Sequence, residues 1–184
     1  MRKRLISAVI CILYLLGGPG KSVANKKAER AIQERFAATG ANGDDLTVAI
    51  QEFSTEEEIQ NLAQIFAQQG EGALQKALAK VKKGLFVTGN AAAAPLVIVQ
   101  SKTEGSGRRL QIIGKAPTVS TEGEILTPHP DYPYTFIQLE VDDKGNGKGM
   151  LIPFAALLFN DQGRMVLKPM SKGAVQLVNV HHEK

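Results

Sequence analysis

Between residues 54 and 83 the apolar positions follow the spacing of an α-helix. Ile59, Leu62 and Phe66 recur at intervals of three and four residues, which places them on one helix face. The segment Ser54-Thr55-Glu56-Glu57 precedes them as a capping box, in which the Ser54 hydroxyl and the Glu57 carboxylate each bind a backbone amide. A second set with the same spacing comprises Leu74, Ala77, Leu78 and Val81. The pattern predicts a helical hairpin over about residues 54–83, joined at Gln69–Gly72.

After Gly84 the period changes to two, which is typical of strands with one buried face. The turns between these segments are short and rich in Gly, Asn and Asp, so we expect neighbouring strands to pair antiparallel. The expected strands are Leu96–Lys102, Arg108–Gly114, Tyr134–Val141, Lys148–Phe159, Arg164–Pro169 and Ala174–His181.

Residues 25–53 allow two interpretations. Asn25–Arg35 has the composition of a polar helix, whereas Glu34–Thr39 and Leu46–Phe53 flank an Asn-Gly step that favours a hairpin turn. The alternation of Leu46, Val48 and Ile50 with polar or small residues favours the hairpin. We therefore expect an α+β fold. Its main part is an antiparallel β-meander over about residues 85–181, strongly curved or barrel-like, in a sheet of seven or eight strands. The two-helix hairpin is expected to pack on one face or end.

The first 24 residues predict export. Met1–Arg4 is cationic, Leu5–Leu16 is apolar except for Ser7, and Ser22-Val23-Ala24 provides small residues for cleavage near Ala24-Asn25. Twelve apolar residues are too few to span a bilayer, which takes about 20. We therefore expect a periplasmic or extracellular mature protein, residues 25–184, that forms a single globular domain without a transmembrane segment.

Removal of this leader changes the charge and the cysteine content. The whole chain has a formal net charge of +4, which is carried by Arg2, Lys3, Arg4 and Lys21, and its single cysteine is Cys11. The mature chain would then have no formal net charge, no disulfide and no thiol nucleophile. An even charge balance argues against nucleic acid as a partner, because phosphate binding requires clustered excess Lys and Arg.

Three segments resemble the recurring blocks of an uncharacterised family of exported bacterial proteins. They are an aromatic-Ser-Thr helix start at Phe53–Glu58, an Asp-Tyr-Pro-aromatic strand at Asp131–Glu140 and an Asp-x-x-Gly-x-Gly turn at Asp142–Gly147. Pro169 and Val175–Val180 extend the resemblance, which covers about Leu46–Val180. The chain departs from the family at Lys168–Ser171, where an acidic, Tyr-containing segment is usual. The resemblance implies export and the fold, and it implies no activity.

The best polar candidate for a binding site is the Pro-rich crossing Thr127–Pro133. His129 and Asp131 lie in this crossing, where a rigid scaffold could hold them, and Tyr132 and Tyr134 beside them could line a recess.

Other motifs favour structural explanations. Gly17–Ser22 has the end of a phosphate loop but lacks its first glycine, since Leu15 stands there. Asp142, Asp143 and Asn146 suggest a calcium loop, yet Lys144 and Pro153 occupy ligand positions, so we expect a plain hairpin turn. His181 and His182 are adjacent and would point to opposite strand faces, and a frayed C-terminus is the simpler expectation. A solvated helix face is predicted by the spacing of Lys76, Lys80 and Lys83. We expect Ser106 to be a turn residue. We therefore expect no metal and no cofactor.

Two function classes remain. The missing nucleophile and the absence of clustered metal ligands favour a non-catalytic module that binds a partner protein, an envelope component or a small apolar ligand through the curved sheet. The alternative is a hydrolase of a periplasmic or extracellular substrate that uses His129 or paired carboxylates such as Glu140 with Asp161 or Asp131. Converging carboxylates in a cleft would favour the enzyme, whereas an apolar pocket or exposed patch would favour binding.

Overall fold

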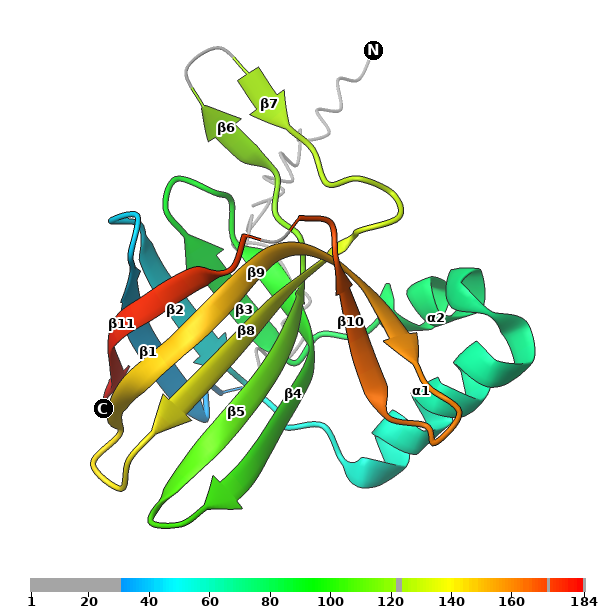
Figure 1. The fold of residues 1–184 in the computed structure, drawn as a ribbon, viewed down its shortest axis with the longest axis horizontal. Coiled ribbons are helices and arrows are strands. Elements are labelled where there is room, and N and C mark those ends of the chain that lie inside the picture. The colour runs from blue at the N-terminus through cyan, green and yellow to red at the C-terminus, as the bar shows by residue number, and fades with distance from the viewer. Residues whose placement is uncertain (1–30, 122–123, 172, 184) are drawn as a thin grey trace, which may run out of the picture.

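The computed structural model describes residues 31–121, 124–171 and 173–183 of the 184-residue chain. The predicted signal peptide and the Asn25–Arg30 part of the possible polar helix lie outside the described residues. The described chain is an antiparallel β-barrel of eight strands with one extra strand, a separate two-stranded sheet and two helices (Figure 1). The predicted mostly antiparallel, barrel-like α+β fold is therefore confirmed at this level.

The chain enters the barrel as a hairpin, the interpretation favoured by its sequence pattern. The strands are β1 (Glu34–Gly40) and β2 (Asp45–Ile50), and they pair antiparallel from Glu34↔Ile50 to Thr39↔Asp45. At the turn, Asn42 Oδ1 accepts a hydrogen bond from the Asp44 amide, and Gly43 has φ 87°. Glycine adopts this left-handed conformation with little strain, which explains the Asn-Gly step.

The helical hairpin is confirmed, with two corrections to its ends. Helix α1 spans Glu56–Gln69 and α2 spans Glu71–Leu78, so the second helix ends five residues before Lys83. The N-cap of α1 is Thr55, not Ser54: Thr55 Oγ1 accepts from the Glu58 amide, and the Glu58 carboxylate accepts from the Thr55 amide. Ser54 is bound instead to strand β4 (Ala94–Glu104), where its Oγ accepts from the Val99 amide at 3.1 Å. A tertiary contact thus moves the capping box by one residue.

The remaining strands include all six that the alternation predicted. They are β3 (Gly84–Thr88), β4 (Ala94–Glu104), β5 (Gly107–Lys115), β6 (Val119–Thr121), β7 (Glu124–Leu126), β8 (Tyr134–Val141), β9 (Asn146–Phe159), β10 (Met165–Pro169) and β11 (Val175–Glu183). The short β6–β7 pair was not predicted and forms a separate two-stranded sheet. Strand β11 continues to Glu183 and pairs with β1 through Phe36↔His182, so the expectation of a frayed C-terminus is wrong for the described residues.

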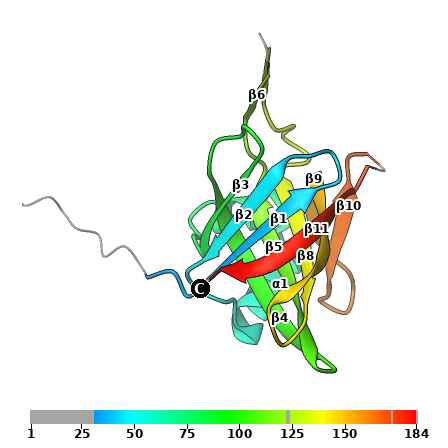
Figure 2. The same ribbon diagram turned by 90° about the vertical axis from the view of Figure 1, so that its left-hand side faces the viewer.

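The barrel closes because β11 lies between β9 and β1. The strand order is β9-β11-β1-β2-β3-β4-β5-β8, and β8 pairs with β9 to complete the circle (Figure 2). Strand β9 is long enough to pair with β11 through its first half and with β10 through its second half. Ala155 is opposite both Tyr134 of β8 and Pro169 of β10, so β10 lies on the edge of β9 opposite to β8.

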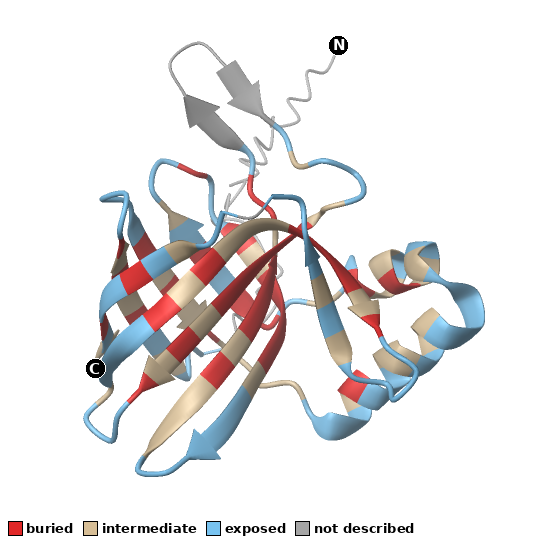
Figure 3. Cartoon of the chain, in the orientation of Figure 1, coloured by how far each residue is buried: buried red, intermediate tan, exposed pale blue. Residues whose placement is uncertain are grey.

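Two apolar clusters hold the fold together. One fills the barrel with side chains from every barrel strand, including the fully buried Phe36, Phe86 and Ile112, as is usual for eight strands. The other joins the outer face of the barrel to Ile59, Leu74 and Leu78 of the helices (Figure 3).

A register shift between Leu96 and Ile98 in β4 lets one strand serve both clusters. Leu96 and Val99 belong to the barrel interior, whereas Val97 and Ile98 belong to the cluster beneath the helices. A strict alternation could not place two consecutive residues on one face, so a β-bulge supplies the change.

Candidate functional site

Strand β10 forms an open edge of the sheet. Among the strands that the structure describes, it pairs with β9 and with no other. Two backbone hydrogen bonds fix its orientation: the Asn160 amide donates to Arg164 O at 3.0 Å, and the Met170 amide donates to Phe154 O at 2.9 Å. Hydrogen-bonded positions therefore fall on Arg164 and Met170, at the two ends of the strand.

Hydrogen-bonded positions alternate along an antiparallel ladder, which assigns the groups between these ends. Val166 and Lys168 direct their N–H and C=O groups toward β9, given the pairing Val166↔Leu158 and Lys168↔Ala156. The N–H and C=O groups of Met165 and Leu167 consequently point away from β9. Pro169 occupies the next outward position, so its lack of an N–H removes no hydrogen bond to β9.

The side chains of β10 alternate between a half-buried face and an exposed face. Met165 and Leu167 are half-buried and pack against the apolar cluster beneath the helices. Val166 is 41% exposed, and Met170 just after the strand is 54% exposed. Lys168 on the same face is also exposed, so the outer side of the strand is accessible along its length.

A polar recess of about 620 Å³ lies at the end of the barrel formed by the β4–β5 and β8–β9 turns and the end of β11. It is lined by Thr103, Ser106, Gly107, Arg108, Asp142, Asp143, Lys144, Gly145 and His182. The two acidic and two basic side chains leave it without a strong charge of either sign, which disfavours a strongly charged ligand.

Two side chains that line this recess, Arg108 and His182, pack against the buried Phe36 ring. Arg108 makes a two-pronged ion pair with Glu34, with one N–O distance of 2.9 Å, and its guanidinium lies 5.5 Å from the centre of the Phe36 ring. The His182 ring lies 5.0 Å from the same ring. His182 Nε2 is buried and has no hydrogen-bond partner among the described residues, so it leaves a polar atom unsatisfied at the barrel end.

The β8–β9 connection is a tight hairpin turn, as its sequence predicted. Asp142 Oδ1 accepts from the amides of Lys144 and Asn146 at 2.9 and 2.8 Å, and Gly145 has φ 83°. The Asp142 carboxylate therefore holds the turn. No group of three or more His, Cys, Asp or Glu residues in the described part of the chain could hold a metal ion.

The structure brings three of the four predicted site residues together. His129 and Tyr132 have ring centres 5.7 Å apart, and His129 Nδ1 lies 3.8 Å from Asp131 Oδ2. The Asp131 amide donates to His129 Nδ1 at 3.2 Å, which uses this nitrogen as an acceptor. The side chains of His129 and Asp131 are 50% and 80% exposed, so this group forms an open turn.

The fourth residue, Tyr134, belongs to the cluster beneath the helices and is 4% exposed. Burial, with a smaller contribution from Glu71, raises the pKa of its hydroxyl to about 12 from the ordinary value of 10.0. Tyr134 is therefore a core residue that remains un-ionised at neutral pH.

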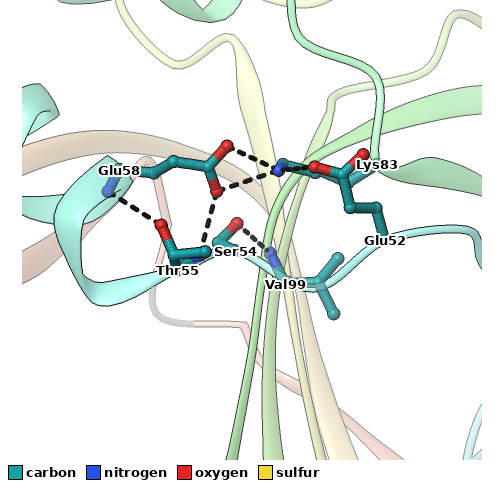
Figure 4. Close-up of polar contacts among 6 residues, drawn as sticks. All are labelled: Glu52, Ser54, Thr55, Glu58, Lys83 and Val99. Atoms are coloured by element: carbon teal, nitrogen blue, oxygen red, sulfur yellow. Dashed lines mark hydrogen bonds and ion pairs between the residues drawn. The ribbon is translucent and has the colours of Figure 1, made fainter.

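A buried ion-pair network was missed by the sequence patterns. Lys83 is 4% exposed, and its Nζ donates to Glu52 Oε1 and to Glu58 Oε1 and Oε2, the latter two at 2.7 and 2.9 Å (Figure 4). The predicted solvated lysine stripe is thus wrong for Lys83. The same Glu58 oxygen that accepts from Lys83 at 2.9 Å completes the capping box with Thr55.

This network ties the helical hairpin to the barrel. The Lys83 amide donates to Leu96 O at 2.8 Å, and Lys83 O accepts from the amides of Gln51 and Glu52 at 2.8 and 3.1 Å. A recess of about 180 Å³ beside it is lined by Ser54, Glu58, Asn61, Leu62, Ala77, Val81, Lys83 and Val97. Because Lys83 is held by two carboxylates and by its backbone, it has a structural role here and is not poised as a nucleophile.

No family model, curated protein or solved structure matches the chain. Within the described residues, no helix has the length and apolar character needed to cross a membrane.

Proposed function

We propose that the protein is an exported, non-catalytic interaction module that binds another polypeptide at its surface. The observation that carries this proposal is the open edge of β10, where the outward N–H and C=O groups of Met165 and Leu167 lie beside the exposed side chain of Val166. An extended segment of another chain can add to such an edge through main-chain hydrogen bonds. Export is supported by the cationic start and apolar segment of residues 1–24.

The filled barrel favours an outer binding surface over an internal ligand. Side chains from all eight barrel strands occupy the interior, and Phe36, Phe86 and Ile112 there are at most 1% exposed. The small apolar ligand considered from the sequence would have to displace part of this core. A polypeptide partner requires no such rearrangement.

Three of the groups considered for hydrolysis have structural partners. Glu140 forms an ion pair with Arg109 at 3.3 Å, and Asp131, whose side chain is 80% exposed, lies 3.8 Å from His129. His129 accepts a backbone hydrogen bond in an open turn. A base that abstracts a proton from a substrate needs a fixed position in a recess. These groups meet that requirement poorly, so strand addition at the β10 edge is favoured over hydrolysis.

Site-specific photo-crosslinking in the cells that express the protein tests the proposal. A photo-reactive amino acid at Val166 should give a discrete adduct with another polypeptide, and Met165→Pro should remove it by deleting one outward N–H. The same amino acid at Leu85, which is 46% exposed on β3, is the matched control. If Val166 gives no adduct, if Leu85 gives the same adduct, or if Met165→Pro leaves the Val166 adduct unchanged, binding through this edge is refuted.

A further inference from the structure

We infer that the β10 edge selects an extended segment in which acidic residues flank an apolar one. This inference rests on the proposed function and adds the chemistry of the partner. It depends on the side chains that flank the free backbone groups.

The exposed face of β10 is basic at both ends and apolar between them. Arg164 and Lys168 are both exposed, and Val166 lies between them at alternate positions along the chain. Strand β10 itself contains no acidic residue. An added strand places its own alternate side chains beside these three, so carboxylates opposite the two cations and an apolar residue opposite Val166 would complement the edge.

The same charges disfavour a second copy of the chain as the occupant. Antiparallel pairing of β10 with itself around Leu167 would place Lys168 of one copy opposite Val166 of the other. It would also bring the Arg164 and Lys168 side chains of both copies into one interface without acidic partners on the strand. Like charges in neighbouring cross-strand positions destabilise a pair, so the charge pattern favours a different, acidic chain.

The available backbone sets the length of the bound segment. Met165 and Leu167 each provide one N–H and one C=O, and Pro169 provides a C=O alone. A partner would form hydrogen-bonded pairs with Met165 and Leu167 and would lose a donor at Pro169. The central contact is therefore about five residues long, which predicts weak affinity without further contacts.

Peptide binding to the purified protein tests this inference. The probe is the fluorescent peptide Thr-Glu-Thr-Val-Thr-Glu-Thr, and the matched control has Lys in place of both Glu residues. Fluorescence anisotropy should show at least about tenfold tighter binding of the acidic peptide, a difference that should shrink as salt is raised because exposed charges are screened.

Two variants separate the contributions of charge and backbone. Arg164→Glu combined with Lys168→Glu should reverse the preference of the two peptides. Met165→Pro should abolish binding of either peptide because it removes an outward N–H, whereas Met165→Ala, which loses the same packing beneath the helices but keeps the N–H, should still bind. Equal affinity for both peptides, or an unchanged preference in the charge-reversed variant, would overturn the inference.

The two proposals fail in distinguishable ways. If Val166 gives a crosslink in cells that depends on Met165 but the acidic peptide has no advantage, the edge binds a partner of other chemistry and only this inference is wrong. If the crosslink is also absent, the proposed function is wrong.

Discussion

The buried ammonium of Lys83 makes the stability of the protein respond asymmetrically to mutation. Its side chain is 5% exposed, whereas the side chains of its partners Glu52 and Glu58 are 35% and 44% exposed. Removal of the carboxylates therefore leaves a charge that water cannot reach. Removal of Lys83 leaves charges that water can hydrate.

The exposures translate into different costs. The double substitution Glu52→Gln with Glu58→Gln keeps the size of both side chains, and Gln at position 58 can still complete the capping box. It should lower the free energy of unfolding by about 3–5 kcal/mol, the cost of a buried charge without its partners. Lys83→Met should cost only about 1 kcal/mol, the scale of partly exposed ion pairs. The triple variant should recover to within about 1 kcal/mol of the wild type, because no buried charge remains.

Urea unfolding of the four proteins at neutral pH measures these differences, provided that the slopes of the transitions agree. The double variant should also melt about 6–20 °C below the wild type. If Lys83→Met is as destabilising as the double variant, or if the triple variant is the least stable, the buried ammonium is not the controlling feature and this reasoning is refuted.

Three other predictions concern single side chains. His182→Phe should raise the free energy of unfolding by about 1 kcal/mol, because it keeps the ring beside Phe36 and removes the unsatisfied Nε2. His181→Phe is the control, and a loss of stability for His182→Phe would contradict the account. Tyr134 has a pKa raised from 10.0 to about 12, so its contribution to stability is complete below pH 10 and is lost as the pH rises toward 12. Tyr134→Phe should therefore reduce the fall in the urea midpoint between pH 10 and 12. An equally steep fall in the variant would contradict this prediction. Thr55→Ala should lower stability by about 1 kcal/mol and speed hydrogen exchange at the Glu58 amide, whereas Ser54→Ala should speed exchange at the Val99 amide; the opposite pairing would restore Ser54 as the helix cap.

Local patterns predicted the strands and helices well because their causes are local. Alternation located β5 and β8, whose residues keep one register over their whole pairing from Arg108↔Val141 to Lys115↔Tyr134. It could not show the bulge at Leu96–Ile98, since all four residues from Leu96 to Val99 are apolar. Closure through β11 depends on pairing between the two ends of the described chain, which no local pattern encodes.

Candidate sites were harder to predict because they depend on distant partners. Lys83 is bound by carboxylates 31 and 25 residues away in the sequence, and its position after a helical pattern indicated a solvated cation. His129, Asp131 and Tyr132 are close in sequence and do meet, whereas the turn into β8 places Tyr134 in the core. One signal for the open edge was present: Pro169 within an alternating segment is typical of an edge strand.

Amide hydrogen exchange along β10 in the free protein tests the central claim most directly. The claim is that this strand has one edge bound to β9 and one edge available to a partner. The amides of Val166, Lys168 and Met170 should be protected by their bonds to β9, while those of Met165 and Leu167 should exchange faster by at least about tenfold. Equal protection at all five amides, or the reverse order, would contradict an open edge and with it the proposed mode of binding.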